Sequence, residues 1–461
     1  MTVNAESTSA VQTSSFGRLV KIFQPAPPAA FELADPGQIA SEYRRWQKRV
    51  LVSSIIGYAT FYFVRKNLSI AIPAMESSLG IHKTQLGLFL TMHGLLYGVS
   101  KFANGFLGDR ANARVLMASG LAMSAILNVL FGFSSTVLAL GVIWTLNGWF
   151  QGMGFPPCAR LIANWFSPKE LATKFSIWNM SHPVGGGLVV ILCGYLVGFN
   201  WRLCFFIPAA IALACAAFLW LTLPDTPPSV GLPEVAGTRS AAQSAASREE
   251  FKHFVIDHVF RNKYIWIVSF ANFFVYIIRY AVLDWGPTLL TESKHIKIAH
   301  AGWMVGGFEF CGLFGALIGG WLTDRWFGGR AVRVCLIYMI LAGVSVYLFW
   351  KIPGQSEFAT AALLGAAGFF IYGPQCLLAV TAANLATKRA AATAIGLTSI
   401  FGYASTVLSG WGLGALVQHY GWSVAFEGLI IVAALGSLLF ALAWPAKAHG
   451  YGAEKAVSSE Q

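Results

Sequence analysis

Apolar segments long enough to cross a membrane follow one another along most of this 461-residue sequence. A helix of about 20 residues spans the roughly 30 Å of hydrocarbon in a bilayer. Six such segments lie in the first half, near residues 51–75, 86–107, 115–134, 137–165, 172–199 and 203–223. Six more lie in the second half, near residues 264–291, 302–323, 332–350, 358–385, 391–418 and 424–444. We therefore predict an all-α membrane protein with twelve transmembrane helices.

Composition supports this prediction. The chain is 56% hydrophobic and only 11% charged, which is more apolar surface than a soluble core of this size could bury. The segment between the two sets of spans is rich in Pro, Ser, Ala and charge, as connectors are. We expect the following division: an N-terminal segment 1–50, a six-helix bundle 51–223, a connector 224–263, a second six-helix bundle 264–445, and a tail 446–461.

The two halves contain matching positions. Arg279 follows Arg65 by 214 residues, and Tyr276 follows Tyr62 by the same interval, so one helix has been duplicated. Such offsets predict two pseudo-symmetric bundles related by an axis along the membrane normal, as in transporters with parallel repeats. A ligand site is then expected at the interface between the bundles, near the midplane of the membrane.

Positive charge predicts the orientation of the chain. If both termini are cytoplasmic, 22 of the 32 Lys and Arg residues lie on the cytoplasmic side, five lie outside and five lie within spans. Short loops on the cytoplasmic side of a membrane carry an excess of Lys and Arg, so this orientation is expected. The same count explains most of the net charge of +12 without a nucleic-acid partner, and no soluble domain is present to hold a duplex.

Arg65 and Arg279 both lie inside apolar spans. A charge at this depth costs roughly 2.5–3.5 kcal/mol on insertion scales, so it usually serves a function and faces protein or water. Guanidinium groups offer forked donors to phosphate or carboxylate oxygens. Two of them, from opposite halves, suit a dianion, and phosphate or a phosphate ester is our first choice. The structural alternative is an ion pair with Asp284 or Glu309.

Residues three and four positions apart share one face of a helix, which extends the predicted site. These residues are Tyr58 and Tyr62 with Arg65, Tyr276 with Arg279, Tyr97 with Lys101, and Asn179 with His182. The tyrosines have packing as an alternative role, and His182 could simply hydrogen-bond a neighbouring helix. Lys66 and Lys101 could contact substrate or neutralise Glu309. The claim of Lys66 is weakened because a regular helix turns it roughly 100° from Arg65.

Two Asp-Arg pairs close corresponding spans. Asp109 and Arg110 end the second span, and Asp324 and Arg325 end the eighth, 215 residues later. We predict that these pairs, together with Glu309, have gating or structural roles. The two Asp-Arg pairs should lie on the cytoplasmic side without touching substrate.

Chemical catalysis is not expected. The sequence has no grouping of nucleophile, base and orienting residue, and no metal-ligand spacing. The seven cysteines lie within or beside apolar spans without a CxxC pair, which favours packing over redox or metal chemistry. No cofactor is predicted, and a monomer is the default for this architecture.

Several motifs together resemble those of the organophosphate:phosphate antiporters of the major facilitator superfamily. They are YATFYFVRKN, YGVSKFANGFLGDRANAR, GWFQGMGFPPCARL, WNMSHPVGGG, DTPPSVGLP, FVYIIRYAVLDWGP and FFIYGPQ. The resemblance covers residues 40 to 445. It implies that Arg65 and Arg279 bind phosphate, and that Tyr58, Tyr62, Lys66, Lys101 and His182 line or flank the site. It also implies the bacterial inner membrane, and exchange of an external organic phosphate for internal inorganic phosphate by alternating access.

The substrate is less clearly indicated. Ile395 and Thr398 stand where hexose-phosphate carriers of the family can have an acidic and a basic residue, which favours glycerol 3-phosphate. PPCARL, WNMS and GPQCLL are more similar to the hexose-phosphate branch, so a hexose phosphate such as glucose 6-phosphate ranks narrowly first. The same branch includes membrane sensors that signal to a partner kinase, and this alternative keeps the same site. A proton-coupled carboxylate carrier is the third possibility.

Overall fold

The computed structural model describes residues 22–108, 111–235, 253–352 and 356–447, and these residues contain helices and no strands. The first half contains α2 (Pro36–Phe63), α3 (Asn67–Leu79), α4 (Lys83–Gly108), α5 (Ala113–Phe133), α6 (Val137–Gln151), α7 (Phe155–Trp165), α8 (Pro168–Asn179), α9 (Ser181–Leu196) and α10 (Leu203–Thr222). Three of the six crossings consist of two helices in succession: α2 with α3, α6 with α7, and α8 with α9. The connector begins with a 3-10 turn, η1 (Pro227–Val230).

The second half follows the same order with longer helices. After the π-helical turn η3 (Ile256–Phe260) come α12 (Lys263–Ser293), α13 (Ile298–Arg325), α14 (Ala331–Lys351), α15 (Glu357–Leu385), α16 (Thr387–Ala404), the π-helical segment η4 (Val407–Gly412) and α17 (Leu413–Leu442). Within α17 the chain turns at Gly421, whose φ of 79° is in the region that favours glycine. The eleventh crossing ends at this turn and the twelfth begins.

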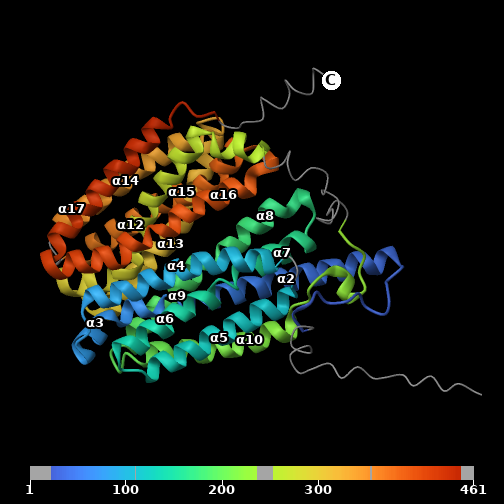
Figure 1. Ribbon diagram of the computed structural model, residues 1–461, viewed down its shortest axis with the longest axis horizontal. Coiled ribbons are helices and arrows are strands. Elements are labelled where there is room, and N and C mark those ends of the chain that lie inside the picture. The colour runs from blue at the N-terminus through green and yellow to red at the C-terminus, as the bar shows by residue number, and fades with distance from the viewer. Residues whose placement is uncertain (1–21, 109–110, 236–252, 353–355, 448–461) are drawn as a thin grey trace, which may run out of the picture.

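The helices form two groups that lie side by side, α2 to α10 and α12 to α17 (Figure 1). Eight helical segments of the described chain are by themselves long and apolar enough to span a membrane, and the last of them contains the turn at Gly421. The predicted all-α fold of twelve spans in two bundles is confirmed. The exact domain boundaries stay predictions.

The bundles are closely packed at the end where α3 meets α4. Lys83 Nζ lies 2.8 Å from Glu76 in its own bundle and 2.8 Å from Glu292 at the end of α12. Nearby, a Cβ atom on Gly87 would lie only 2.5 Å from the carbonyl oxygen of Gly410. Small residues permit this approach of α4 to η4. If the predicted orientation holds, this is the external end of the molecule.

The start of the connector is fixed to the first bundle. Asp225 is buried, lies 3.4 Å from Arg160, and accepts hydrogen bonds from the backbone amides of Ala26 and Ala113. Arg160, which lies within the fourth span, therefore has a structural partner near the membrane surface.

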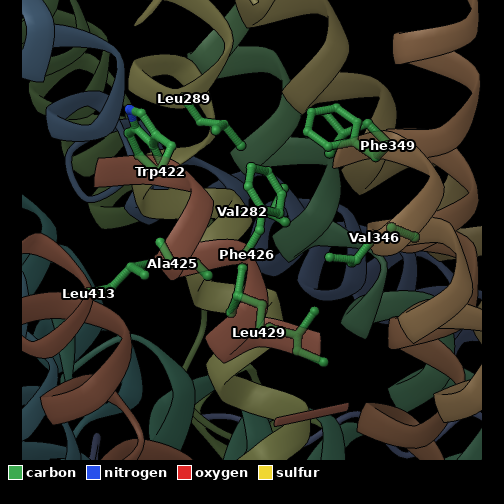
Figure 2. A pocket seen from close by; sticks show the side chains of 13 residues that line it. Val282, Leu289, Val346, Phe349, Leu413, Trp422, Ala425, Phe426 and Leu429 are labelled. Carbon is green, nitrogen blue, oxygen red and sulfur yellow. The ribbon is translucent and has the colours of Figure 1, made fainter. Parts of the chain in front are cut away.

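The second bundle contains an apolar pocket. It lies between α12, α14, α15 and α17 (Figure 2), and its lining includes Ile278, Val282, Val346, Phe349, Leu364, Ala367 and Phe426. Leu364 is the eighth residue of α15, and Trp144 is the eighth residue of α6. In the first bundle Trp144 is fully buried and packs 5.2 Å from Phe131, centroid to centroid. A smaller side chain at position 364 leaves space in the second bundle.

Candidate functional site

Arg65 lies at a break in the first span. α2 ends at Phe63 and α3 begins at Asn67, so Arg65 belongs to neither helix. Its guanidinium carbon lies 4.0 Å from the ring centroid of Tyr97 and 5.4 Å from that of Tyr62. No carboxylate of the described residues lies within ion-pair distance of it. Aromatic faces attract a cation and leave its N–H donors available to an anion.

Arg279 projects from the middle of α12, which is continuous at this level. Its Nη2 donates a hydrogen bond of 2.9 Å to the hydroxyl of Tyr372 on α15. That hydroxyl in turn donates to the carboxylate of Glu309 on α13. Arg279 is buried, and its Nε has no partner among the described residues. The alternative of a direct Arg279–Glu309 ion pair is not what the structure has, because Tyr372 lies between them.

The neighbouring residue, Lys66, and neither of the two arginines, forms a buried ion pair with Asp284. Its Nζ lies 2.5 Å from Asp284 Oδ1 on α12, and both side chains are at most 10% exposed. This pair joins the two bundles beside Arg65. Asp284 therefore neutralises Lys66 and not one of the arginines.

Lys101 and three tyrosines connect the two sides of the interface. Lys101 Nζ donates to the hydroxyl of Tyr403 over 3.1 Å and lies 4.0 Å from the ring of Phe155. Tyr403, on α16, packs edge-on against Tyr97 of α4 and against Tyr276 of α12. The centroid distances are 5.1 Å and 6.4 Å. These rings bring the positions around Arg65 and Arg279 into one cluster.

His182 completes the contact between bundles on the other side. Its ring lies 5.8 Å from Tyr62 of the first bundle and stacks 6.2 Å from Tyr372 of the second. Nδ1 donates to the carbonyl of Asn179 over 2.6 Å, so the neutral ring carries its lone pair on Nε2. Nε2 is buried without a partner among the described residues.

Tyr58 and the two Asp-Arg pairs make up the rest of the predicted residues. Tyr58 is buried in aromatic packing, 4.7 Å from Trp178 and 5.8 Å from Tyr62. Asp324 and Arg325, at the end of α13, are exposed. Asp109 and Arg110 lie outside the described residues. The roles assigned to all these positions stay predictions.

The balance of charge is the main electrostatic property of the site. Arg65, Lys66, Lys101 and Arg279 provide four cations, and the carboxylates facing them are Asp284 and Glu309. Two positive charges remain uncompensated by the described residues of the cluster. Lys66 and Arg279 are buried, while Arg65 and Lys101 are half-buried. An excess of charge in such surroundings is costly unless an anion neutralises it.

Three site tyrosines had no clear signal in the sequence: Tyr280, Tyr372 and Tyr403. Tyr280 stands over the ammonium group of Lys66 at 5.0 Å and 5.7 Å from Arg279. In an apolar span a tyrosine is indistinguishable from a packing aromatic, although Tyr372 does fall within the motif FFIYGPQ.

Among the described residues, no group of three or more His, Cys, Asp or Glu side chains could hold a metal ion.

Comparisons with known proteins agree with this architecture. A family model for the Major Facilitator Superfamily matches residues 54–410 and 290–459. A bacterial homologue of the human lysosomal transporter Spinster, in an inward-facing and unoccupied conformation, aligns with a TM-score of 0.69 over 86% of this chain and 95% of that chain. At 15% sequence identity, this likeness concerns the fold alone.

Closer relatives define the branch. A probable hexose phosphate transport protein of Chlamydia muridarum is 37% identical, covering 92% of this chain and 97% of that protein. The glycerol-3-phosphate transporter of Bacillus subtilis is also 37% identical, over 92% and 98%. The membrane sensor protein UhpC of Escherichia coli is 36% identical, over 90% and 96%. The chain belongs to the Major Facilitator Superfamily. It is a multi-pass membrane protein of the organophosphate:phosphate antiporter branch, and it is not an enzyme.

Proposed function

We propose that this protein carries an organic phosphate ester into the cell in exchange for internal inorganic phosphate. The observation that supports this most directly is the excess of two positive charges in the interface cluster. A phosphate ester near neutral pH carries a charge of about −1.5 to −2, so one bound molecule balances the site. A monocarboxylate would leave it cationic.

The two arginines then share the phosphate group. Arg65 has its N–H donors available because it packs on aromatic faces, while Arg279 is held by Tyr372 and keeps Nε without a partner. Each guanidinium can donate two parallel hydrogen bonds to phosphate oxygens. His182 Nε2, as an acceptor, suits a hydroxyl of the ester or a protonated phosphate oxygen.

Neutralisation by the ligand explains exchange. With the external end closed through Lys83, Glu292 and the contact at Gly87, the conformation is ready to release or take up ligand on the cytoplasmic side. Return through an occluded state buries the arginines, which is costly when they are unpaired. The loaded protein crosses this state more readily than the empty one, so transport becomes exchange.

The preferred ester is a hexose phosphate, followed by glycerol 3-phosphate. Relatives named for each substrate are equally similar to this chain. The position is the inner membrane of a bacterium, with both termini cytoplasmic and the protein acting as a monomer.

A sensor is the second candidate function, because a relative named as a membrane sensor is almost as similar. Such a protein would bind an external sugar phosphate and signal to a partner kinase. Its binding site would contain the same arginines.

Counterflow separates these functions. Liposomes containing the purified protein are loaded with labelled phosphate, and external glucose 6-phosphate or glycerol 3-phosphate is added. A transporter releases label in response to its ester, and protein-free liposomes do not. Saturable ester binding without any release would support the sensor. Uptake of labelled citrate driven by a proton gradient, with no effect of phosphate, would support the carboxylate carrier.

A further inference from the structure

Three buried asparagines of the first bundle converge on the break between α2 and α3. Asn128 on α5 and Asn147 on α6 both donate to the carbonyl oxygen of Val64, at 3.0 Å and 2.8 Å. Asn67, at the start of α3, donates to Asn128 Oδ1 over 2.8 Å. All three side chains are completely buried.

The bonded carbonyl is the one that the break releases. In a continuous helix the carbonyl of Val64 would accept the amide of Leu68, four residues later. Here residues 64–66 leave the helix. The amide of Lys66 still donates to the carbonyl of Tyr62, four residues back, but the amide of Arg65 turns to the same carbonyl, three residues back. A buried carbonyl without a hydrogen-bond partner destabilises the conformation that exposes it. The two asparagine amides remove that cost and so stabilise the broken conformation.

At each matching position the second bundle has an apolar residue where the first bundle has an asparagine. Asn128 is the sixteenth residue of α5, and the sixteenth residue of α14 is Val346. Asn147 is the eleventh of α6, and the eleventh of α15 is Ala367. Asn67 follows Arg65 by two residues, as Ala281 follows Arg279. There α12 is unbroken, and these apolar residues line the pocket of Figure 2.

We propose that Asn128 and Asn147, with Asn67, are positioning residues that hold the α2–α3 break and thereby direct Arg65 and Lys66 into the ligand site. This inference rests on the proposed function for its substrate, phosphate. The asparagines do not touch the ligand, and they act through the backbone at Val64.

Asn147 allows the cleanest test, because its amide group donates only to Val64 among the described residues. Asn147→Ala introduces the residue found at the matching position of the second bundle. We expect the KM for phosphate exchange in liposomes to rise about tenfold, with turnover changed less than about twofold. Asn147→Ser keeps a shorter donor and should give an intermediate KM, which also provides a measurable variant if the alanine form folds poorly.

Asn104→Ala is the matched control. Asn104 is an equally buried asparagine of the first bundle, but it bonds only within α4, to Ser100. Thermal unfolding in detergent should show similar losses of stability for the two alanine variants, while only Asn147→Ala raises KM. An equal rise in KM for Asn104→Ala, or an unchanged KM for Asn147→Ala, would overturn the proposal.

A second readout does not depend on the substrate. The Arg65→Cys variant is treated with a water-soluble methanethiosulfonate reagent and its reaction rate is measured. The rate of the chain with Arg65, which reports the native cysteines, is subtracted. Adding Asn147→Ala should lower this rate at least about threefold, because residue 65 turns away from the aqueous site when the break is lost. An unchanged rate contradicts the positioning role. If the parent protein exchanges no phosphate but the rate still falls, the proposed function fails and the positioning role stands.

Discussion

The ammonium group of Lys66 and the carboxylate of Asp284, 2.5 Å apart, form a buried ion pair that links the two bundles beside Arg65. Removing one member of such a pair leaves an uncompensated buried charge. We expect Asp284→Asn to lower the free energy of unfolding by about 3 kcal/mol. The double variant Lys66→Met with Asp284→Leu should be more stable than the single one. Thermal unfolding in detergent compares them, and a single variant as stable as the double variant would contradict this account.

Conservative replacement of either central arginine should impair transport. Lysine retains the charge but cannot donate two parallel hydrogen bonds. Arg65→Lys and Arg279→Lys should therefore each reduce phosphate exchange in liposomes about tenfold or more. Arg202→Lys is the control, since Arg202 donates to the carbonyl of Ser134 away from the cluster. Exchange at the wild-type rate by both Arg65→Lys and Arg279→Lys would disprove bidentate binding of phosphate by these arginines.

The hydroxyl of Tyr372 has a predicted role in holding Arg279. Tyr372→Phe removes the group that joins Arg279 to Glu309 and should raise the KM for phosphate about tenfold. Tyr338→Phe is a matched control, because the hydroxyl of Tyr338 is buried in the same bundle without a partner among the described residues. Kinetics of exchange measure both. Equal behaviour of the two variants would mean that the Tyr372 hydroxyl does not support the site.

Closure of the external end should depend on the small residue at position 87. Gly87→Val places side-chain atoms against the backbone of Gly410, so the closed state becomes harder to reach. We expect exchange to slow about tenfold while phosphate binding changes little, as for a variant that alters a conformational step. Gly105→Val, in the same helix, meets no atoms within 4 Å and should exchange normally. A binding loss that parallels the loss of exchange would point to damage of the site instead.

The apolar pocket of the second bundle offers a stabilising substitution. Leu364→Phe adds a ring where the first bundle has Trp144, and filling such a space commonly gains about 0.5–2 kcal/mol. Val380→Phe adds the same ring to an exposed position of α15 and should leave stability nearly unchanged. A thermal midpoint for Leu364→Phe below that of the parent would show that the pocket cannot accept the ring.

The spans were predictable because the hydrocarbon thickness imposes one helix length on every crossing. The seventh span, predicted at 264–291, is α12 from Lys263 to Ser293, and the third, predicted at 115–134, is α5 from Ala113 to Phe133. The charged centre was predictable for a related reason. A guanidinium is so unfavourable in lipid that Arg65 and Arg279 had to face protein or water.

The break after Phe63 was not predictable from local sequence. The duplicated spacing indicates two equal helices, and no proline lies at residues 64–66. The break depends on Asn128 and Asn147, which reach it from other helices. The break also means that the helical rotation between Arg65 and Lys66 does not apply. The rotation of 100° per residue holds only within a helix, and Lys66 lies outside one.

The backbone that carries Arg65 differs from the backbone that carries Arg279, and this difference bears on how substrate preference can change. Arg65 leaves the chain at an interruption between two helices, whereas Arg279 rises from an unbroken one. We therefore expect a substrate of a different size to be accommodated by displacement of Arg65, while Arg279 stays in place. Selection for a new preference can act on a short stretch of polypeptide and leave the other half of the molecule unaltered.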